Sequence, residues 1–347
     1  MSNVNVHTLK LDLDWNLISL VSETDRFDAA WKAIERREGQ SLKELKSIAT
    51  VRSVGASTRI EGSRLSDEEV DVLLKHVDIS KIQERDQQEV VGYFEVLDLI
   101  GESFEDIPVT ENGLKNLHNQ LMRYSKKDQW HKGDYKKHSN AVQAEMPDGS
   151  SQIIFRTTEP GFATEDAMRA LIGWHDQDKA VHALVKCAIF SYEFVTIHPF
   201  QDGNGRLSRL LATLLLRKYG YRWIQYVSLE HEIEHQKTEY YRLLRSCQAQ
   251  RPGEDITPWV LFFLNCLKNI QESLMTKLRT HGMEKQITKR EKDLLVLIEN
   301  YPGIKSGEIA KKLNISSPTV KRILNNLLIK KLIEKQGGGP GTNYTIM

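Results

Sequence analysis

The residues best suited to chemistry lie in one stretch, HPFQDGNGRLSR, residues 198 to 209. Its glycines Gly203 and Gly205 each cost roughly 1 kcal/mol in a helix relative to alanine, so some other demand must keep them there. Glycines flanking Asn204 at a helix start expose backbone N–H groups, which form an anion cradle together with the helix dipole. The pattern favours phosphate binding, and a plain connector capped by Asp202 is the alternative.

Four polar side chains around the cradle extend this interpretation. Arg206 and Arg209 are three residues apart, so both lie on one face of the first helical turns and can fork phosphate oxygens. Asp202 is a hard oxygen ligand of the kind that Mg²⁺ prefers. His198 can take a proton near neutral pH. No GxxxxGK[ST] motif is present, so a P-loop is not indicated.

Amphipathic helices are expected on both sides of this stretch. Apolar residues recur at three- and four-residue steps over much of the chain. Gly39 and Gly62 stand where helix C-caps are expected. The segment 139–157 differs, because Pro147-Asp148-Gly149 separates two short runs of strand character and predicts a β-hairpin. The expected helices span about 84–102, 111–123, 165–177, 180–197, 204–219, 231–249 and 257–281.

The stretch resembles the signature of the Fic family, HxFx[DE]GNGRxxR, at every defining position. The resemblance implies an all-helical core that transfers AMP from ATP to a protein hydroxyl, with Mg²⁺ as cofactor. It also implies a role for each residue: His198 is the general base, Asp202 holds Mg²⁺, Gly203, Asn204 and Gly205 cradle the α- and β-phosphates, Arg206 and Arg209 bind the β- and γ-phosphates, and Phe200 anchors the loop in the core.

Two further segments are similar to the family. GDYKKHSNAV resembles the segment that leads into the family's flap, although Lys136 replaces the usual arginine, which puts a phosphate role there in doubt. The hairpin 139–157 would be the flap, which holds a target protein by strand addition; a plain surface hairpin is the alternative. In TEYYRLLRSCQ, the resemblance implies that Tyr240 contacts the adenine, and that Gln248 does so too. Packing in the core is the alternative interpretation.

A built-in brake is also indicated. Ser57 and Glu61 are four apart on an expected helix at about 45–62, and they resemble the family's inhibitory motif [ST]xxxE[GN]. A glutamate brought to Arg209 would occupy the fork meant for the γ-phosphate. The short motif alone is common, and an exposed glutamate is its alternative meaning.

The C-terminal region carries its own charge and pattern. Residues 283–347 hold twelve Lys and Arg against six Asp and Glu, a net charge of +6, which leaves −5 for the first 282 residues. The pattern here is helix, helix, turn and helix, followed by KQGGGPGTNY. It predicts a winged helix-turn-helix whose second motif helix starts near Ser317. Its groove-facing residues would be Ser317, Thr319, Lys321 and Arg322, with further basic residues at 311, 312, 330 and 331. DNA and a protein both remain open as its partner.

The predicted fold class is mainly α: a helical Fic core with a β-hairpin flap, plus a C-terminal winged helix-turn-helix domain. The expected domains are an N-terminal helical region at 1–104, a catalytic core at 105–282 and the winged helix at 283–347. No apolar run approaches the roughly 20 residues of a membrane span, and no secretion signal is evident, so we expect a cytoplasmic protein. Cys187, Cys247 and Cys266 are expected to be buried core residues.

The leading functional hypothesis is a protein adenylyltransferase that also modifies itself and is inhibited by Glu61. A DNA-binding regulator with a nucleotide-sensing core is the alternative from another class. An enzyme that transfers a different group, or that removes AMP, is a third. Members of the family are often dimers, but no feature of this sequence specifies an interface.

Overall fold

The computed structural model describes residues 8–37, 39–76, 82–145, 151–286, 288–330, 332–339 and 342–346. The chain divides into two compact units, residues 1–275 and 276–347. The first unit is helical, with one antiparallel hairpin, which confirms the predicted fold class. No helix among the described residues combines the length and the apolarity needed to cross a membrane.

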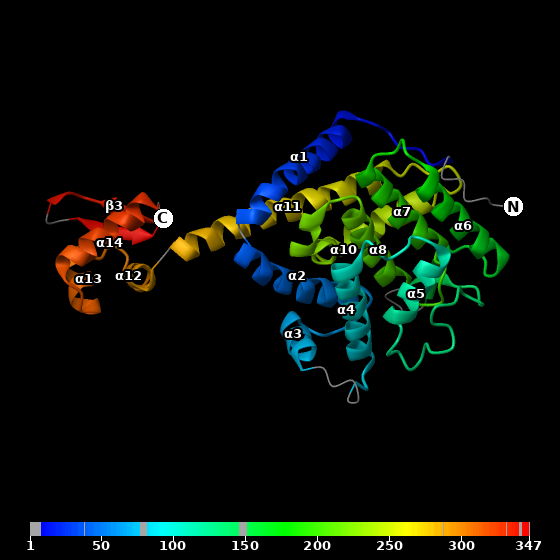
Figure 1. Cartoon of the computed structure of the whole chain (residues 1–347), viewed down its shortest axis with the longest axis horizontal. Coiled ribbons are helices and arrows are strands. Elements are labelled where there is room, and N and C mark those ends of the chain that lie inside the picture. The colour runs from blue at the N-terminus through cyan, green and yellow to red at the C-terminus, as the bar shows by residue number, and fades with distance from the viewer. Residues whose placement is uncertain are drawn as a thin grey trace. The chain divides into compact units, whose positions relative to one another are not determined.

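The first unit contains these elements: α1 (Trp15–Arg37), α2 (Gly39–Ile60), α3 (Asp67–Lys75), α4 (Arg85–Ser103), α5 (Glu111–Leu121), β1 (Ala141–Glu145), β2 (Ser151–Arg156), α6 (Phe162–Gln177), α7 (Ala183–Ile197), α8 (Asn204–Lys218), the 3₁₀ helix η3 (Arg222–Tyr226), α9 (Leu229–His235), α10 (Lys237–Gln248) and α11 (Thr257–Gln286), which continues past residue 275. Figure 1 shows α7 and α8 among the surrounding helices.

Helices α7 and α8 form the centre of this unit and pack against each other. Every residue of α7 from Leu184 to Ile197 is buried, as expected of a helix that is apolar all round. The polar side chains inside this pair bond to neighbouring backbone: Ser191 Oγ donates to the carbonyl of Cys187, and Ser208 Oγ donates to that of Ser191. The loop between the two helices is thereby fixed at both ends by buried structure.

Helix α2 packs against α4, η3 and α9, so its position relative to α8 is set by several elements. Its end is capped as expected by Gly62, which has a φ of +106°. Gly39, in contrast, is the first residue of α2 and ends no helix, since α1 has already ended at Arg37. Ser66 and Glu69 form a capping box at the start of α3.

The hairpin pairs β1 with β2, from Ala141 opposite Arg156 to Glu145 opposite Ser151, with an irregularity between Val142 and Gln143. The expected turn at Pro147-Asp148-Gly149 lies outside the described residues. All three cysteines are free and buried, which confirms their predicted place in the core.

The second unit contains α12 (Lys289–Asn300), α13 (Ser306–Leu313), α14 (Ser317–Ile329), β3 (Ile333–Gln336) and β4 (Asn343–Ile346). The two strands pair antiparallel, and the helices enclose a separate apolar core that includes Leu294, Ile309 and Val320. This is the predicted winged helix, with α14 starting at Ser317. Of its basic residues, Lys311, Lys321 and Arg322 are exposed, but Lys330 is paired with Glu291 at 2.9 Å.

Candidate active site

His198 follows directly after α7 in the left-handed region, with a φ of +53°. Its Nδ1 lies 3.2 Å from the carbonyl oxygen of Val195. Because a carbonyl only accepts, Nδ1 carries the proton and Nε2 keeps its lone pair. Burial lowers the pKa of His198 to about 4, so the ring is neutral at pH 7. The residue can therefore accept a proton at Nε2.

The loop that follows closes on itself through one side chain. Asn204 accepts from the backbone N–H of Phe200 at 2.9 Å and donates to its carbonyl at 2.8 Å. Phe200 is fully buried, which confirms it as the anchor of the loop. Gly203 has a φ of +78°, a conformation that side chains other than glycine rarely adopt, and α8 begins at the next residue. The glycine turn thus leads directly into α8, as the sequence predicted, although Gly203 and Asn204 are buried.

His118, which the sequence analysis did not identify, packs against this loop. The ring of His118 stacks on Phe200 with 3.8 Å between centroids. Its Nδ1 accepts from the N–H of Gly133 at 2.9 Å, so Nε2 carries the proton and donates to the carbonyl of Asp202 at 3.0 Å. Burial lowers the pKa of His118 to about 4, which keeps this neutral arrangement. No spacing in the sequence connects residue 118 to the loop.

Asp202 and Arg206 form a charged pair at the start of α8. Arg206 NH2 lies 3.3 Å from Oδ1 of Asp202, and Oδ2 lies 3.7 Å from Arg85. Burial acts to raise the pKa of Asp202, but Arg206 and the N–H of Gly203 outweigh it, so the pKa is lowered. Glu89 orients Arg206 from the other side, 3.3 Å from NH1. The carboxylate is therefore ionised and held at the helix N-terminus.

Arg209 is buried and held by the end of α2. Its Nε donates to Ser57 Oγ at 2.8 Å, and its NH2 donates to the Ser57 carbonyl at 2.9 Å and to Glu61 Oε1 at 2.8 Å. Burial alone would lower the pKa of Arg209, yet the Glu61 carboxylate raises it above its ordinary value. The two residues of the candidate inhibitory motif thus both contact this arginine.

Glu61 lies one residue beyond the end of α2, outside the helix in which it was expected. Its carboxylate lies directly over the glycine turn: a Cβ added to Gly205 would stand 2.3 Å from Oε1 of Glu61. The glutamate therefore occupies the space above the backbone at the start of α8. This is the space that an anion bound to the cradle would use.

Tyr240 is brought to the same place, but as a buried side chain. It is 3% exposed, packs against Tyr241 and Trp259, and its hydroxyl interacts with Arg209. Gln248 is also buried and donates to Thr196 Oγ1 at 3.0 Å. Tyr240 and Gln248 are therefore both packed in the core, and Tyr240 also lies beside Arg209.

Lys136 joins the root of the hairpin to the end of α7. Its Nζ donates to Asn140 Oδ1 at 3.0 Å, to Thr157 Oγ1 at 2.8 Å and to the Ile197 carbonyl at 3.2 Å. Burial lowers the pKa of Lys136 to about 8, since no carboxylate pairs with it in these contacts. All of its bonds go to protein groups, so the residue positions the hairpin next to His198.

Metal ligands are sparse at this site. Across the part of the chain that the structure describes, no group of three or more His, Cys, Asp or Glu side chains is placed to hold a metal ion. Asp202, with its side chain 33% exposed, is the carboxylate at the cradle. Mg²⁺ commonly binds through one or two carboxylates, substrate phosphates and water, and Asp202 fits such a role.

Two segments of the chain match known protein families. Residues 108–216 match the Fic/DOC family, and residues 287–337 match the MarR family. The protein named "Protein adenylyltransferase Fic" from Drosophila grimshawi is 25% identical over 256 residues, which cover 72% of this chain and 47% of that protein. The chain therefore spans about half the length of the curated relatives that it matches.

Solved structures are similar as well. The crystal structure of a Fic family protein from Desulfovibrio desulfuricans G20 aligns with a TM-score of 0.65 at 25% identity, covering 98% of both chains. A Fic domain containing signaling protein from Bacteroides thetaiotaomicron aligns with a TM-score of 0.61 at 23% identity, covering 74% of this chain and 97% of that one. The second likeness concerns the fold alone.

Proposed function

Since residues 108–216 match the Fic/DOC family, we propose that this chain is a protein adenylyltransferase, which transfers AMP from ATP to a Ser, Thr or Tyr hydroxyl of a protein. One observation carries the proposal: a neutral imidazole, a glycine turn at a helix start and a buried guanidinium lie together within residues 198–209. Phosphoryl-type transfer depends on positioning and charge neutralisation, which these groups can supply.

The reaction follows from the placement of the groups. Nε2 of His198 takes the proton of the target hydroxyl while that oxygen forms a bond to the α-phosphorus of ATP. The bond from the α-phosphorus to the bridging oxygen breaks, and pyrophosphate leaves. Backbone N–H groups at Gly203, Asn204 and Gly205 bind the α- and β-phosphates, and Arg206 and Arg209 bind the β- and γ-phosphates.

Asp202 would hold Mg²⁺, which neutralises phosphate charge when it is bound. The support for this role is the ionised carboxylate, fixed by Arg206 and by the N–H of Gly203 at 2.5 Å. Tyr240 would contact the adenine side of the nucleotide. The hairpin at 139–157 would hold the target by adding a strand, with Lys136 keeping its root beside His198.

Glu61 inhibits this reaction, because its carboxylate occupies the side of the Arg209 guanidinium that would bind the γ-phosphate. The supporting contacts are the 2.8 Å bond from Arg209 to Glu61 and the position of that carboxylate over Gly205. ATP can bind productively only when Glu61 leaves. Ser57 assists by accepting from Nε of Arg209.

The test is incubation of the full chain with ATP and Mg²⁺, followed by intact-protein mass spectrometry. Glu61→Gly should gain AMP at least tenfold faster than the wild type, and Glu61→Gly combined with His198→Ala should gain none. Glu69→Gly, which changes an exposed capping glutamate, serves as the matched control and should behave as the wild type. Equal rates for Glu61→Gly and wild type would reject the brake, and no AMP on any form would reject the proposed AMP transfer.

A second candidate function rests on the C-terminal unit. Its winged helix matches the MarR family and exposes Lys321 and Arg322 on α14, so a DNA-binding regulator with a nucleotide-sensing core is the alternative. The same mass-spectrometric assay separates the two, because the regulator would show no His198-dependent AMP transfer. Loss of DNA binding in Lys321→Ala, Arg322→Ala would favour the regulator.

A further inference from the structure

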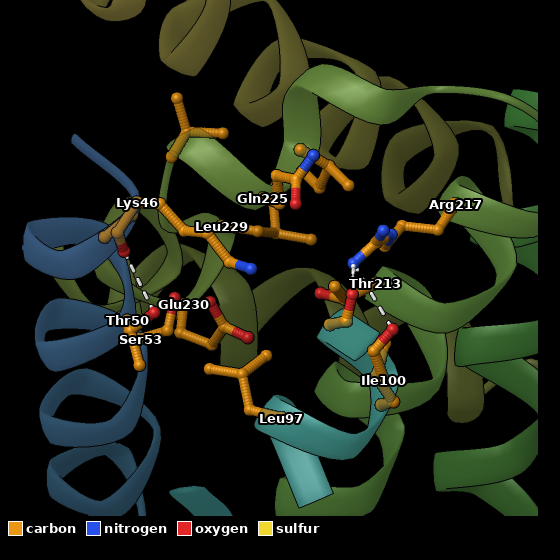
Figure 2. A pocket seen from close by; sticks show the side chains of 14 residues that line it. Lys46, Thr50, Ser53, Leu97, Ile100, Thr213, Arg217, Gln225, Leu229 and Glu230 are labelled. Carbon is orange, nitrogen blue, oxygen red and sulfur yellow. Dashed lines mark hydrogen bonds between the residues drawn. The ribbon is translucent and has the colours of Figure 1, made fainter. Parts of the chain in front are cut away.

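A separate cavity lies between α2, α4, α8, η3 and α9 in the first unit (Figure 2). Its volume is about 40 Å³. One water needs roughly 10–15 Å³ on this scale, so the space suits about three to four non-hydrogen atoms. Polar and aliphatic side chains share the lining; the polar ones include Lys46, Thr50, Ser53, Thr213, Arg217 and Glu230.

Arg217 dominates the polar side of the cavity. It is 8% exposed, and its NH1 donates to the carbonyls of Ile100 at 3.3 Å and Gly101 at 2.8 Å. Its Nε has no hydrogen-bond partner, and no carboxylate lies within 4.0 Å of it among the described residues. Burial lowers the pKa of Arg217 and outweighs the carboxylates of Glu102 and Glu105, which act to raise it. Figure 2 shows the guanidinium turned toward Thr213 and the interior of the cavity.

The rest of the lining narrows the ligand class. Lys46 adds a second positive charge and is partly exposed, with its ammonium 3.2 Å from Glu102. Glu230 is the one acidic side chain in the lining, and its oxygens accept from the hydroxyls of Tyr93 at 2.8 Å and Ser228 at 3.3 Å. Leu97 and Leu229 form an aliphatic wall. Positive charge, hydroxyls and an apolar wall in a small space suit a carboxylate on a short alkyl chain.

We propose that this cavity binds a short aliphatic carboxylate, with its oxygens on Arg217 and its alkyl group against Leu97 and Leu229. Guanidinium groups bind carboxylates through charge-assisted hydrogen bonds, and Nε of Arg217 is available for one. The ligand would connect α8 to α2, because Thr50 and Ser53 of α2 line the same space. Acetate is the simplest member of this class.

Such a ligand would also act on the brake, a consequence that rests on the proposed function. Ser53 is one helical turn before Ser57, the residue whose Oγ accepts from Arg209. On the other side, Glu230 accepts from Tyr93, whose hydroxyl interacts with Ser57. A bound carboxylate therefore fixes α2 in the position in which Glu61 contacts Arg209, and it slows AMP transfer.

Binding is measured with the full chain carrying ¹³C-labelled Ile and Leu methyl groups, titrated with sodium acetate against sodium chloride at equal ionic strength. The methyl signals of Ile100 and Leu97 should shift saturably, with a Kd of roughly 1 mM. Arg217→Met should abolish the shift, and Arg222→Met, a change at an exposed arginine of η3, should retain it. Ala49→Leu fills the cavity without touching Arg217, so it keeps the test decisive if Arg217→Met fails to fold.

Two results would overturn the site: no saturable shift, which would mean that water fills the cavity, or a shift that survives both Arg217→Met and Ala49→Leu. The effect of the bound carboxylate on inhibition by Glu61 is measured separately. Acetate should lower AMP transfer by the wild type at least twofold and leave Glu61→Gly unchanged. If no form transfers AMP, the proposed function fails while the methyl titration still decides the site; if AMP transfer persists without methyl shifts, the cavity proposal alone fails.

Discussion

Two buried arginines of one helix have opposite surroundings. Arg209, near the start of α8, bonds to Ser57 and to the carboxylate of Glu61, and that carboxylate raises its pKa. Arg217, eight residues later, bonds to two backbone carbonyls and lies over the ring of Phe104 at 4.4 Å, and burial lowers its pKa. The protein places a carboxylate in hydrogen-bond contact with the guanidinium of Arg209 but only backbone carbonyls in contact with that of Arg217.

The difference teaches how a buried guanidinium is used. A buried charge without a partner is costly, so it must be neutralised by the protein or by a ligand. At Arg209 the protein supplies the carboxylate itself, and a ligand has to compete with it. At Arg217 a ligand would meet no such competitor. Regulation by competition and regulation by occupancy can therefore exist within one helix.

The largest expected effect is the loss of AMP transfer when Arg209 is changed. In a Glu61→Gly background, Arg209→Lys should lower the rate of AMP transfer about 100-fold, because lysine cannot bind the γ-phosphate with two parallel bonds. The rate is measured by single-turnover transfer with labelled ATP. Arg217→Lys in the same background should stay within about twofold, since that residue lies outside the proposed nucleotide site.

An equal loss in both lysine variants would contradict the assignment. It would mean that α8 tolerates no change at either arginine, and that the two ends do not have separate functions. Thermal unfolding of both variants, measured alongside, shows whether a lost rate reflects a lost fold.

The next effect concerns what holds Glu61 in place. Arg59, two residues before Glu61, donates to Glu234 with Nε at 2.6 Å and NH2 at 2.9 Å, and NH2 also lies 2.9 Å from Asp67. Arg59→Met removes this bidentate connection between α2 and α9. We expect basal AMP transfer to rise about tenfold, because a loosened α2 end releases Arg209 more often.

The matched control is Arg242→Met, which breaks a similar bidentate pair with Glu239 on an exposed surface. Exposed pairs contribute little, so that variant should transfer AMP at the wild-type rate. In the Glu61→Gly background, Arg59→Met should have no further effect. A rise of equal size in that background would place the action of Arg59 outside the brake.

Sequence reasoning was most successful where function follows from local spacing. The stretch HPFQDGNGRLSR specifies a helix end, a glycine turn and a new helix start, and the structure has all three there. The winged helix could be predicted for the same reason, because its helices and strands are short and consecutive. The contact between Glu61 and Arg209 spans 148 residues, and only the resemblance to a known motif pointed to it.

Other parts of the site could not be predicted, since they depend on contacts between distant segments. His118 reaches Asp202 across 84 residues, and Arg217 reaches Ile100 across 117. Lys136 is flanked by polar residues that indicate an exposed position, yet it is 2% exposed. Only tertiary packing decides which lysine or arginine of a polar segment becomes buried, so no periodicity identifies it.

The smallest expected effect extends the comparison to Lys136, a third buried cation, which like Arg217 has no carboxylate among its hydrogen-bond partners. Its pKa in the folded chain is about 8 and its ordinary value is 10.5, so between these values the unfolded chain binds more protons. Folding stability should therefore increase as pH rises through this window. The wild type should gain about 1 kcal/mol between pH 8 and pH 9 relative to Lys136→Met, measured by urea unfolding. Lys137→Met, at a neighbouring exposed lysine, should follow the wild type, and parallel pH profiles for all three proteins would show that Lys136 is not desolvated.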